Sequence, residues 1–87
     1  MKAKSLTQEH IDELFSEAEK TVITMHDKCT VMVCQLRSGF VLVESSACVD
    51  PSNYDLDMGV SICEVRIKNK LWELEGYKLQ SEVATCS

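Results

Sequence analysis

Five cysteines and two histidines are the residues of this chain that could serve as nucleophiles, bases or soft metal ligands. If Ser38 and Gly39 form a tight turn, the strands that flank it place Cys29 directly opposite Cys48, with His26 a few residues upstream. Three such side chains in one neighbourhood raise the possibility of zinc. Their spacing matches no C-x-x-C pair and supplies no clear fourth ligand. We therefore expect no metal, and keep these three residues only as weak candidates.

Catalysis by a cysteine requires a base within hydrogen-bonding distance of the thiol. His10 and His26 are the only histidines, and His26 beside Cys48 is the one pairing with a reasonable geometry. Nothing else in the sequence supports that pair, so we expect no catalytic residues, no cofactor and no enzymatic activity. Four of the cysteines lie among apolar residues, which is typical of buried structural thiols. A thiol- or metal-dependent enzyme is the third-ranked interpretation.

Composition limits the class of protein further. The chain has 87 residues, of which 45% are hydrophobic, and a net charge of −5, so residues 1–87 suit a single small domain. No apolar run approaches about 18 residues and no secretory pattern opens the chain, so we expect a cytoplasmic protein with no membrane contact and reduced thiols. The acidic balance argues against direct binding to nucleic acid. A protein partner with a basic surface is the expectation.

A first helix is predicted over residues 7–20, with Thr7 as its N-cap. Its apolar positions recur at spacings of three, four and seven: Ile11, Leu14, Phe15 and Ala18. The opposite side is acidic. Such a run is commonly a solvated face, and the alternative is a docking surface for a basic partner. Under that alternative the partner-binding residues are Glu9, Asp12, Glu13 and Glu17.

Two segments rich in β-branched residues predict an antiparallel hairpin over residues 21–48, with room for a third strand. A two-residue loop at Ser38-Gly39 pairs Arg37 with Phe40 and sets the register of the remaining pairs. One face, expected to receive a helix, then carries Thr30, Met32, Cys34 and Leu36 opposite Val41, Val43, Ser45 and Ala47. The other face is mixed and carries Val31, Val33, Gln35 and Arg37 opposite Phe40, Leu42, Glu44 and Ser46.

The stretch ESSACVDPSNYD is predicted to be a joint between elements. Asp50-Pro51 turns the chain out of the sheet, and Ser52 or Asn53 caps a second helix over residues 53–74. Gly59 inside that helix predicts the close approach of another backbone, and Gly76 is the expected C-cap. Residues 80–87 are expected to fray.

The second helix is apolar on two sides. One stripe consists of Met58, Ile62, Val65 and Trp72, and the other of Leu56, Cys63, Ile67, Leu71 and Leu74. One stripe is expected to pack on the hairpin, and the other to meet the first helix or a second subunit. Because so short a chain gains stability by self-association, we expect a dimer. Its predicted interface residues are Phe40, Leu42, Ile67 and Leu71.

The fold class is therefore α+β: a helix, an antiparallel hairpin and a second helix packed on the sheet. The tracts VCQLRSGFVLVESSACVDPSNYD and KLWELEGYKL, within residues 29–79, resemble a family of small proteins of tailed phages and prophages, the phage gene-49/gene-66 family. The chain departs from the usual pattern at Val43, where a glycine is common, and at Cys63-Glu64-Val65, which replaces an alanine-rich run.

The resemblance implies a phage accessory protein that is cytoplasmic in the infected bacterium and is not a virion component. The family brings no established catalytic residues to carry over. Together with small size and acidity, this makes a binding module that inhibits a host or defence protein, as anti-CRISPR proteins do, the leading hypothesis. A homo-oligomeric structural or regulatory phage protein is the second.

Overall fold

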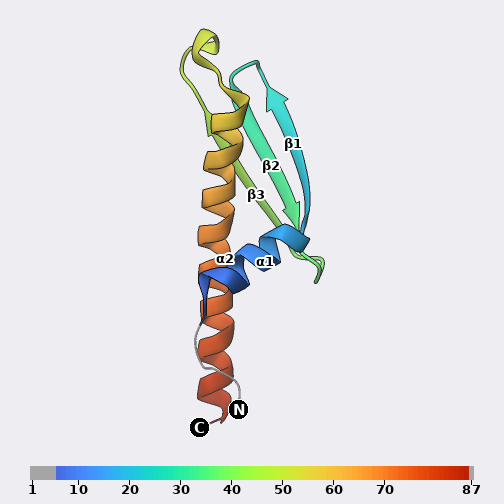
Figure 1. Ribbon diagram of the computed structural model, residues 1–87, viewed down its shortest axis with the longest axis vertical. Helices are drawn as coiled ribbons and strands as arrows, with labels where there is room; N and C mark the ends of the chain where they lie inside the picture. The colour runs from blue at the N-terminus through green and yellow to red at the C-terminus, as the bar shows by residue number, and fades with distance from the viewer. Residues whose placement is uncertain (1–5, 87) are drawn as a thin grey trace.

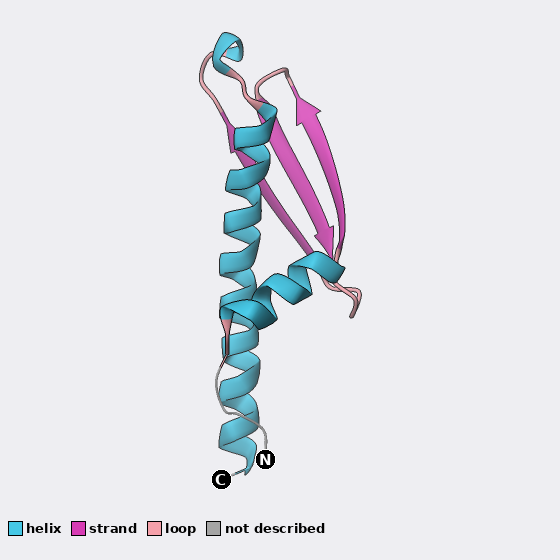
Figure 2. Cartoon of the chain, viewed as in Figure 1, coloured by secondary structure: helices cyan, strands magenta, loops and turns pink. Residues whose placement is uncertain are grey.

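The computed structural model describes residues 6–86. Its elements in chain order are α1 (Gln8–Glu17), β1 (Glu19–Met25), β2 (Cys29–Gln35), β3 (Val41–Ala47), the short 3-10 helix η1 (Pro51–Asn53) and α2 (Leu56–Cys86). The strands form one antiparallel sheet in the order β1-β2-β3 (Figure 1). α2 packs on β2 and β3, and α1 crosses α2 beside the end of the sheet (Figure 2). The predicted α+β class is confirmed.

α1 begins as predicted and ends earlier. The hydroxyl of Thr7 accepts the N–H of His10 at 3.1 Å, which is the expected N-cap. The helix ends at Glu17 rather than at Lys20, because Ala18 is already extended and β1 follows at once. Strand formation by the residues after Ala18 therefore outcompetes their continuation of the helix.

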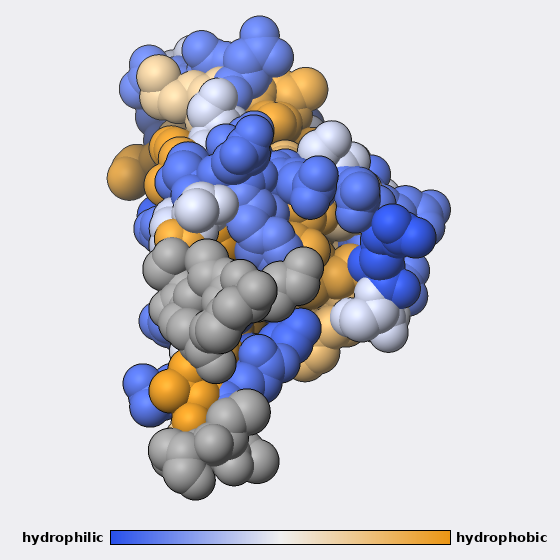
Figure 3. All heavy atoms as spheres, turned by 60° about the horizontal axis from the view of Figure 1, so that its bottom comes forward, coloured by the Kyte–Doolittle hydropathy of each residue, from blue (hydrophilic) through white to orange (hydrophobic). Residues whose placement is uncertain are grey.

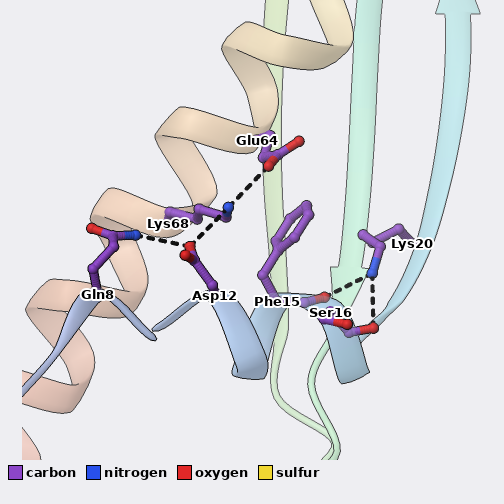
Figure 4. Close-up of polar contacts among 7 residues, drawn as sticks. All are labelled: Gln8, Asp12, Phe15, Ser16, Lys20, Glu64 and Lys68. Carbon is purple, nitrogen blue, oxygen red and sulfur yellow. Dashed lines mark hydrogen bonds and ion pairs between the residues drawn. The ribbon is translucent and has the colours of Figure 1, made fainter. Parts of the chain in front are cut away.

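Lys20 stabilises the C-terminus of α1 (Figure 4). Its ammonium donates to the carbonyl oxygen of Phe15 at 2.7 Å and to that of Ala18 at 2.9 Å. It also lies 4.6 Å from the centroid of the Phe15 ring. These contacts bind carbonyls at the C-terminal end of α1 and place a positive charge at the negative end of its dipole.

The loop between β2 and β3 has three residues instead of the predicted two. The N–H of Gly39 donates to the carbonyl of Leu36 at 2.8 Å, and the N–H of Leu36 donates to the carbonyl of Phe40 at 2.8 Å. Gly39 has a φ of 98°, a left-handed conformation that glycine adopts without strain and that this loop type requires. Cys34 consequently pairs with Leu42, so the predicted register was wrong by one residue.

A shift of one residue moves every β3 side chain to the opposite face. The face of β2 that meets α2 is the predicted one, with these residues buried: Thr30, Met32 and Cys34. From β3, however, Leu42 is buried, while Val41 and Val43 lie on the outer face and are 49% and 56% exposed. The prediction that Val41 and Val43 receive the helix was therefore wrong.

α2 begins at Leu56, where the carboxylate of Asp55 accepts the N–H of Met58 at 3.2 Å. The two residues expected to cap it, Ser52 and Asn53, lie in η1 instead. Pro51 and the two residues after it form η1, so Asp55 is the residue in position to cap α2.

The other end of α2 extends well beyond its predicted end. The helix passes Leu74 and the expected C-cap Gly76 and runs to Cys86, so the predicted boundary and frayed tail were wrong. A glycine inside a helix costs only about 1 kcal/mol relative to alanine. No proline follows Pro51, so nothing else in the sequence forces an end. The 31-residue helix, about 46 Å long, gives the molecule its elongated shape of 55 × 20 × 19 Å.

One hydrophobic core holds the elements together. Its members come from α1, β2, β3 and α2: Ile11, Phe15, Ala18, Met32, Cys34, Leu42, Cys63, Ile67 and Leu71. A single stripe of α2 faces both the sheet and α1, and the close approach predicted at Gly59 is confirmed by its contact with Thr30. Of the other predicted stripe, Met58 and Val65 face outward, at 61% and 58% exposed, whereas Trp72 packs against the core.

Candidate functional site: the interaction surfaces

An ion-pair network joins α1 to α2 (Figure 4). The ammonium of Lys68 lies 3.0 Å from a carboxylate oxygen of Asp12 and 2.9 Å from one of Glu64. Gln8 donates to Asp12 at 2.8 Å, and the Lys68 ammonium is 5.2 Å from the centroid of the Phe15 ring. Asp12, which was predicted to bind a partner, therefore holds the two helices together.

These contacts change the acidity of both charged groups. The hydrogen bonds from Gln8 and Lys68 lower the pKa of Asp12 below its usual value. The hydrogen bonds to Glu64 and Asp12 raise the pKa of Lys68 above its usual value. Both groups are thus charged across the physiological range, and the single Lys68 ammonium is shared between the carboxylates of Asp12 and Glu64.

The remaining acidic residues of α1 are less engaged. Glu17 lies 3.4 Å from Arg37 in an exposed pair, which contributes little to stability. Glu9 and Glu13 are exposed, and within residues 6–86 neither has an ion-pair partner. Of the four predicted partner-binding residues, these two keep an unneutralised charge. We name Glu9 and Glu13, with the more weakly paired Glu17, the acidic row of α1.

The predicted dimer interface lies mostly inside the protomer. Leu42, Ile67 and Leu71 are core residues with 9%, 0% and 0% exposure, because the observed register and the crossing of α1 cover them. Only Phe40, which is 52% exposed beside the β2–β3 loop, offers surface to a second molecule. The structure thus corrects the placement of the predicted interface, while self-association itself stays a prediction.

The weak metal candidates are not brought together in the predicted way. Cys29 pairs with Ala47 rather than with Cys48, because the register differs by one residue. The Cys48 thiol points to the carbonyl oxygen of Asp50, 3.2 Å away. In the described part of the chain no three His, Cys, Asp or Glu side chains are grouped so that they could hold a metal ion. The four cysteines whose side chains the structure describes are free thiols: Cys29, Cys34, Cys48 and Cys63.

Two of these thiols are embedded in the contact between α2 and the sheet. Burial raises the pKa of both Cys34 and Cys63. The thiol of Cys63 donates weakly to the carbonyl of Thr30 at 3.7 Å. These cysteines therefore act as small core residues and stay protonated at neutral pH.

The joint after β3 contains a contact that sequence inspection missed. The hydroxyl of Tyr54 lies 2.7 Å from that of the fully buried Thr30 and 3.0 Å from that of Thr24. A shallow hollow between the joint and α2 lies beside it, and no buried side-chain polar atom of residues 6–84 lacks a partner. The only sequence signal was the tyrosine that follows the Asp-Pro turn. The stretch is a joint, as predicted.

The outer face and the β1 edge of the sheet form a second exposed surface. All seven residues of β1 are exposed, including Val22, Ile23 and Met25 at 41–45%. The register places Ile23 and Met25 on the same outer face as Val41 and Val43, with β2 between the two strands, and places Val22 on the face that meets α2. In Figure 3, which views the molecule toward the C-terminal end of α2, hydrophobic side chains likewise reach the surface between hydrophilic ones.

A sequence model of a family of phage proteins matches residues 6–83, which span every strand, α1 and most of α2. The chain belongs to the phage protein (N4 Gp49/phage Sf6 gene 66) family. Neither a curated protein nor a solved structure shows significant similarity to this gp49/66 protein. Over the described residues, none of its helices is long and apolar enough to cross a membrane.

The positions at which the sequence was expected to depart from the family pattern occupy different environments in this gp49/66 protein. Val43 projects from the exposed outer face of the sheet, where a side chain meets no packed neighbour from α2. Cys63 is fully buried against the sheet, whereas Val65 is 58% exposed on the far side of α2. Val43 and Val65 are thus exposed apolar residues, and Cys63 is part of the core.

Proposed function

We propose that this gp49/66 protein is an accessory protein that binds a bacterial host or defence protein through a basic surface of that partner and inhibits or modulates it, in the manner of anti-CRISPR proteins. It acts in the cytoplasm of the infected or lysogenic bacterium, without catalysis or a cofactor. The observation that carries the proposal is the acidic row of α1, in which Glu9 and Glu13 stay unneutralised beside residues whose charges are paired.

The spacing of the row has a cost that a partner would offset. Glu9, Glu13 and Glu17 follow one another at intervals of four, so their side chains are neighbours on one face of α1. Like charges at this spacing destabilise a helix by about 0.2–0.5 kcal/mol per pair. A cationic surface placed against the row would reverse the sign of that contribution, and its field would speed association.

The row is also held on a rigid support. α1 is anchored by the buried side chains of Ile11 and Phe15 and by the contact between Asp12 and Lys68. A recognition surface on a packed helix loses little conformational freedom when it binds, which favours affinity. The same α1 residues thus divide into an inner set that fixes the helix and an outer set that is available to a partner.

The test is affinity capture of the tagged protein from lysates of several host strains, in parallel at about 50 mM and about 500 mM salt, because salt screens exposed charges. The proposal predicts one stoichiometric protein, rich in surface lysine or arginine, retained at low salt and lost at high salt. Retention of no salt-sensitive protein from any host strain would overturn it.

A further inference from the structure

The two edges of the sheet differ in which backbone groups are already bound. The N–H of Leu36 donates to Phe40, and the N–H of Cys48 donates to the carbonyl of Lys28, so the even-numbered residues of β2 are bonded to β3. In an antiparallel ladder the bonding direction alternates along each strand, so the odd-numbered residues of β2 are bonded to β1. The register pairs these with odd-numbered residues of β1. The N–H and C=O groups that face away from the sheet on β1 belong to Lys20, Val22 and Thr24.

The same alternation shows that the β3 edge is partly occupied. Ser45 directs its carbonyl away from β2, and that oxygen accepts a hydrogen bond from Arg66 of α2. Within residues 6–84 no side chain binds the outward backbone groups of β1, since Tyr54 contacts only the side-chain hydroxyl of Thr24. α2 packs on β2 and β3, and Figure 1 shows β1 as the strand farthest from α2. β1 is therefore the open edge of the sheet.

The usual protection of an open edge is missing here. Edge strands are commonly guarded by a proline, a bulge or a lysine that projects into solvent. β1 has no proline, and its one lysine, Lys20, uses its ammonium to bind the carbonyls of Phe15 and Ala18. Seven exposed residues in an unguarded strand present a template for a further strand.

We propose that β1 pairs in antiparallel fashion with β1 of a second copy of this chain. The two-fold axis lies between Val22 and the Val22 of the second copy. The three outward-facing residues are spaced symmetrically about Val22, so this register places Val22 opposite its own copy and Lys20 opposite the second copy's Thr24. All of their free backbone groups are then bonded, in about six new hydrogen bonds. The product is a continuous six-stranded sheet with an isologous interface.

Charge and side-chain pairing both favour a second copy as the occupant. The only charged residues of β1, Glu19 and Lys20, lie at the same end of the strand, and the antiparallel register sets them opposite the second copy's Met25 and Thr24. No like charges face each other in this strand pair, although each chain carries a net charge of −5. Val22, now 41% exposed, is covered by its own copy. A parallel arrangement would instead set each charge beside an identical one.

Sedimentation velocity of the full chain in reducing buffer tests the proposal, at protomer concentrations from about 1 to about 500 µM, a span that covers weak and standard affinities. We expect a reversible dimer at the upper concentrations. Val22→Pro removes an N–H that β2 does not use, so the protomer can fold while the dimer dissociates at least tenfold more readily. The matched control, Val43→Pro on the other edge, should leave dimerisation unchanged.

Amide hydrogen exchange of the wild-type chain, followed residue by residue with NMR, gives a readout that does not depend on the folding of a variant. The amides of Lys20, Val22 and Thr24 should gain protection as concentration rises, whereas that of Val43 should not. A monomer at every concentration, or a dimer that Val43→Pro disrupts and Val22→Pro does not, would overturn the proposal. Protection that stays independent of concentration at all three amides would overturn it as well.

Discussion

Gly59 of α2 lies so close to Thr30 of β2 that a Cβ atom at position 59 would fall 2.2 Å from the Thr30 hydroxyl oxygen and 2.8 Å from its Cβ. Neither atom is the end of a flexible chain, so the contact can be relieved only by moving the helix from the sheet. This contact sets how closely α2 approaches the sheet, and with it the packing of the core that supports α1.

Gly59→Ala is therefore expected to destabilise the fold by about 1–3 kcal/mol, since the strain of overpacking exceeds the gain in helix propensity. Gly76→Ala is the matched control, because the nearest atom to its added Cβ, in Leu6, is 4.0 Å away. That variant should stabilise the protein by about 0.5–1 kcal/mol. Urea unfolding of the two variants measures both values. Equal effects of the same sign would show that the close approach is not a constraint.

Removal of the Tyr54 hydroxyl should destabilise the protein, although Tyr54 lies in a connection between β3 and α2. Tyr54→Phe leaves the buried Thr30 hydroxyl without that partner, with an expected loss of about 1–2 kcal/mol. Adding Thr30→Val to Tyr54→Phe should recover part of the loss, because the orphaned hydroxyl is then absent. A double-mutant cycle measured by chemical denaturation tests this coupling. Strict additivity of the two changes would contradict it.

The contact between Asp12 and Lys68 predicts a defined dependence of stability on pH. The pKa of Asp12 is lower in the folded protein than its usual value of about 3.9, so its contribution is present above that pH and is lost as pH falls through the folded pKa. Asp12→Asn should reduce stability slightly at neutral pH and have no effect well below pH 3. The raised pKa of Lys68 keeps the pair intact up to strongly alkaline pH.

Thermal unfolding of the wild type and Asp12→Asn between pH 2 and pH 8 makes the comparison. Glu13→Gln, which removes one carboxylate from the same helix without an ion pair, serves as the control. A difference between the wild type and Asp12→Asn that persists unchanged in acid would rule out the electrostatic explanation.

The four described cysteines should react in two classes with an alkylating reagent. Cys29 and Cys48 are partly exposed, whereas Cys34 and Cys63 are fully buried and have a raised pKa. Because the buried thiols react only after the structure opens, their modification should be slower by at least about a hundredfold. Peptide mapping by mass spectrometry over time resolves the individual sites. Comparable rates at Cys34 and Cys29 would show that the packing of α2 on the sheet is loose.

Local patterns were sufficient to predict the fold class, the start of α1 and the face of β2 that meets α2. They did not separate β1 from β2, because the turn between them contains no glycine. His26 and Asp27 instead adopt left-handed conformations, with φ values of 55° and 57°. The register error at Gly39 has a similar origin, since two- and three-residue hairpin loops both favour a glycine at a position with positive φ.

The acidic row could be predicted from spacing alone, but its division into paired and unpaired residues could not. Whether Asp12 meets Lys68 depends on where α1 crosses α2, which is set by packing between segments far apart in the sequence. The length of α2 and the open edge at β1 are also tertiary features. Each follows from what a segment does or does not contact, and local composition carries little information about that.

The most direct test of the proposed function compares capture by three tagged proteins from one host lysate at low salt, with quantitative mass spectrometry of the retained material. These are the wild type, Glu9→Lys/Glu13→Lys, and Glu73→Lys/Glu82→Lys, which makes the same change in net charge at exposed positions of α2. Circular dichroism melting confirms that all three are folded. We expect the α1 variant to retain at least tenfold less of the partner, while the α2 variant retains as much as the wild type. Equal retention by the wild type and the α1 variant would contradict it.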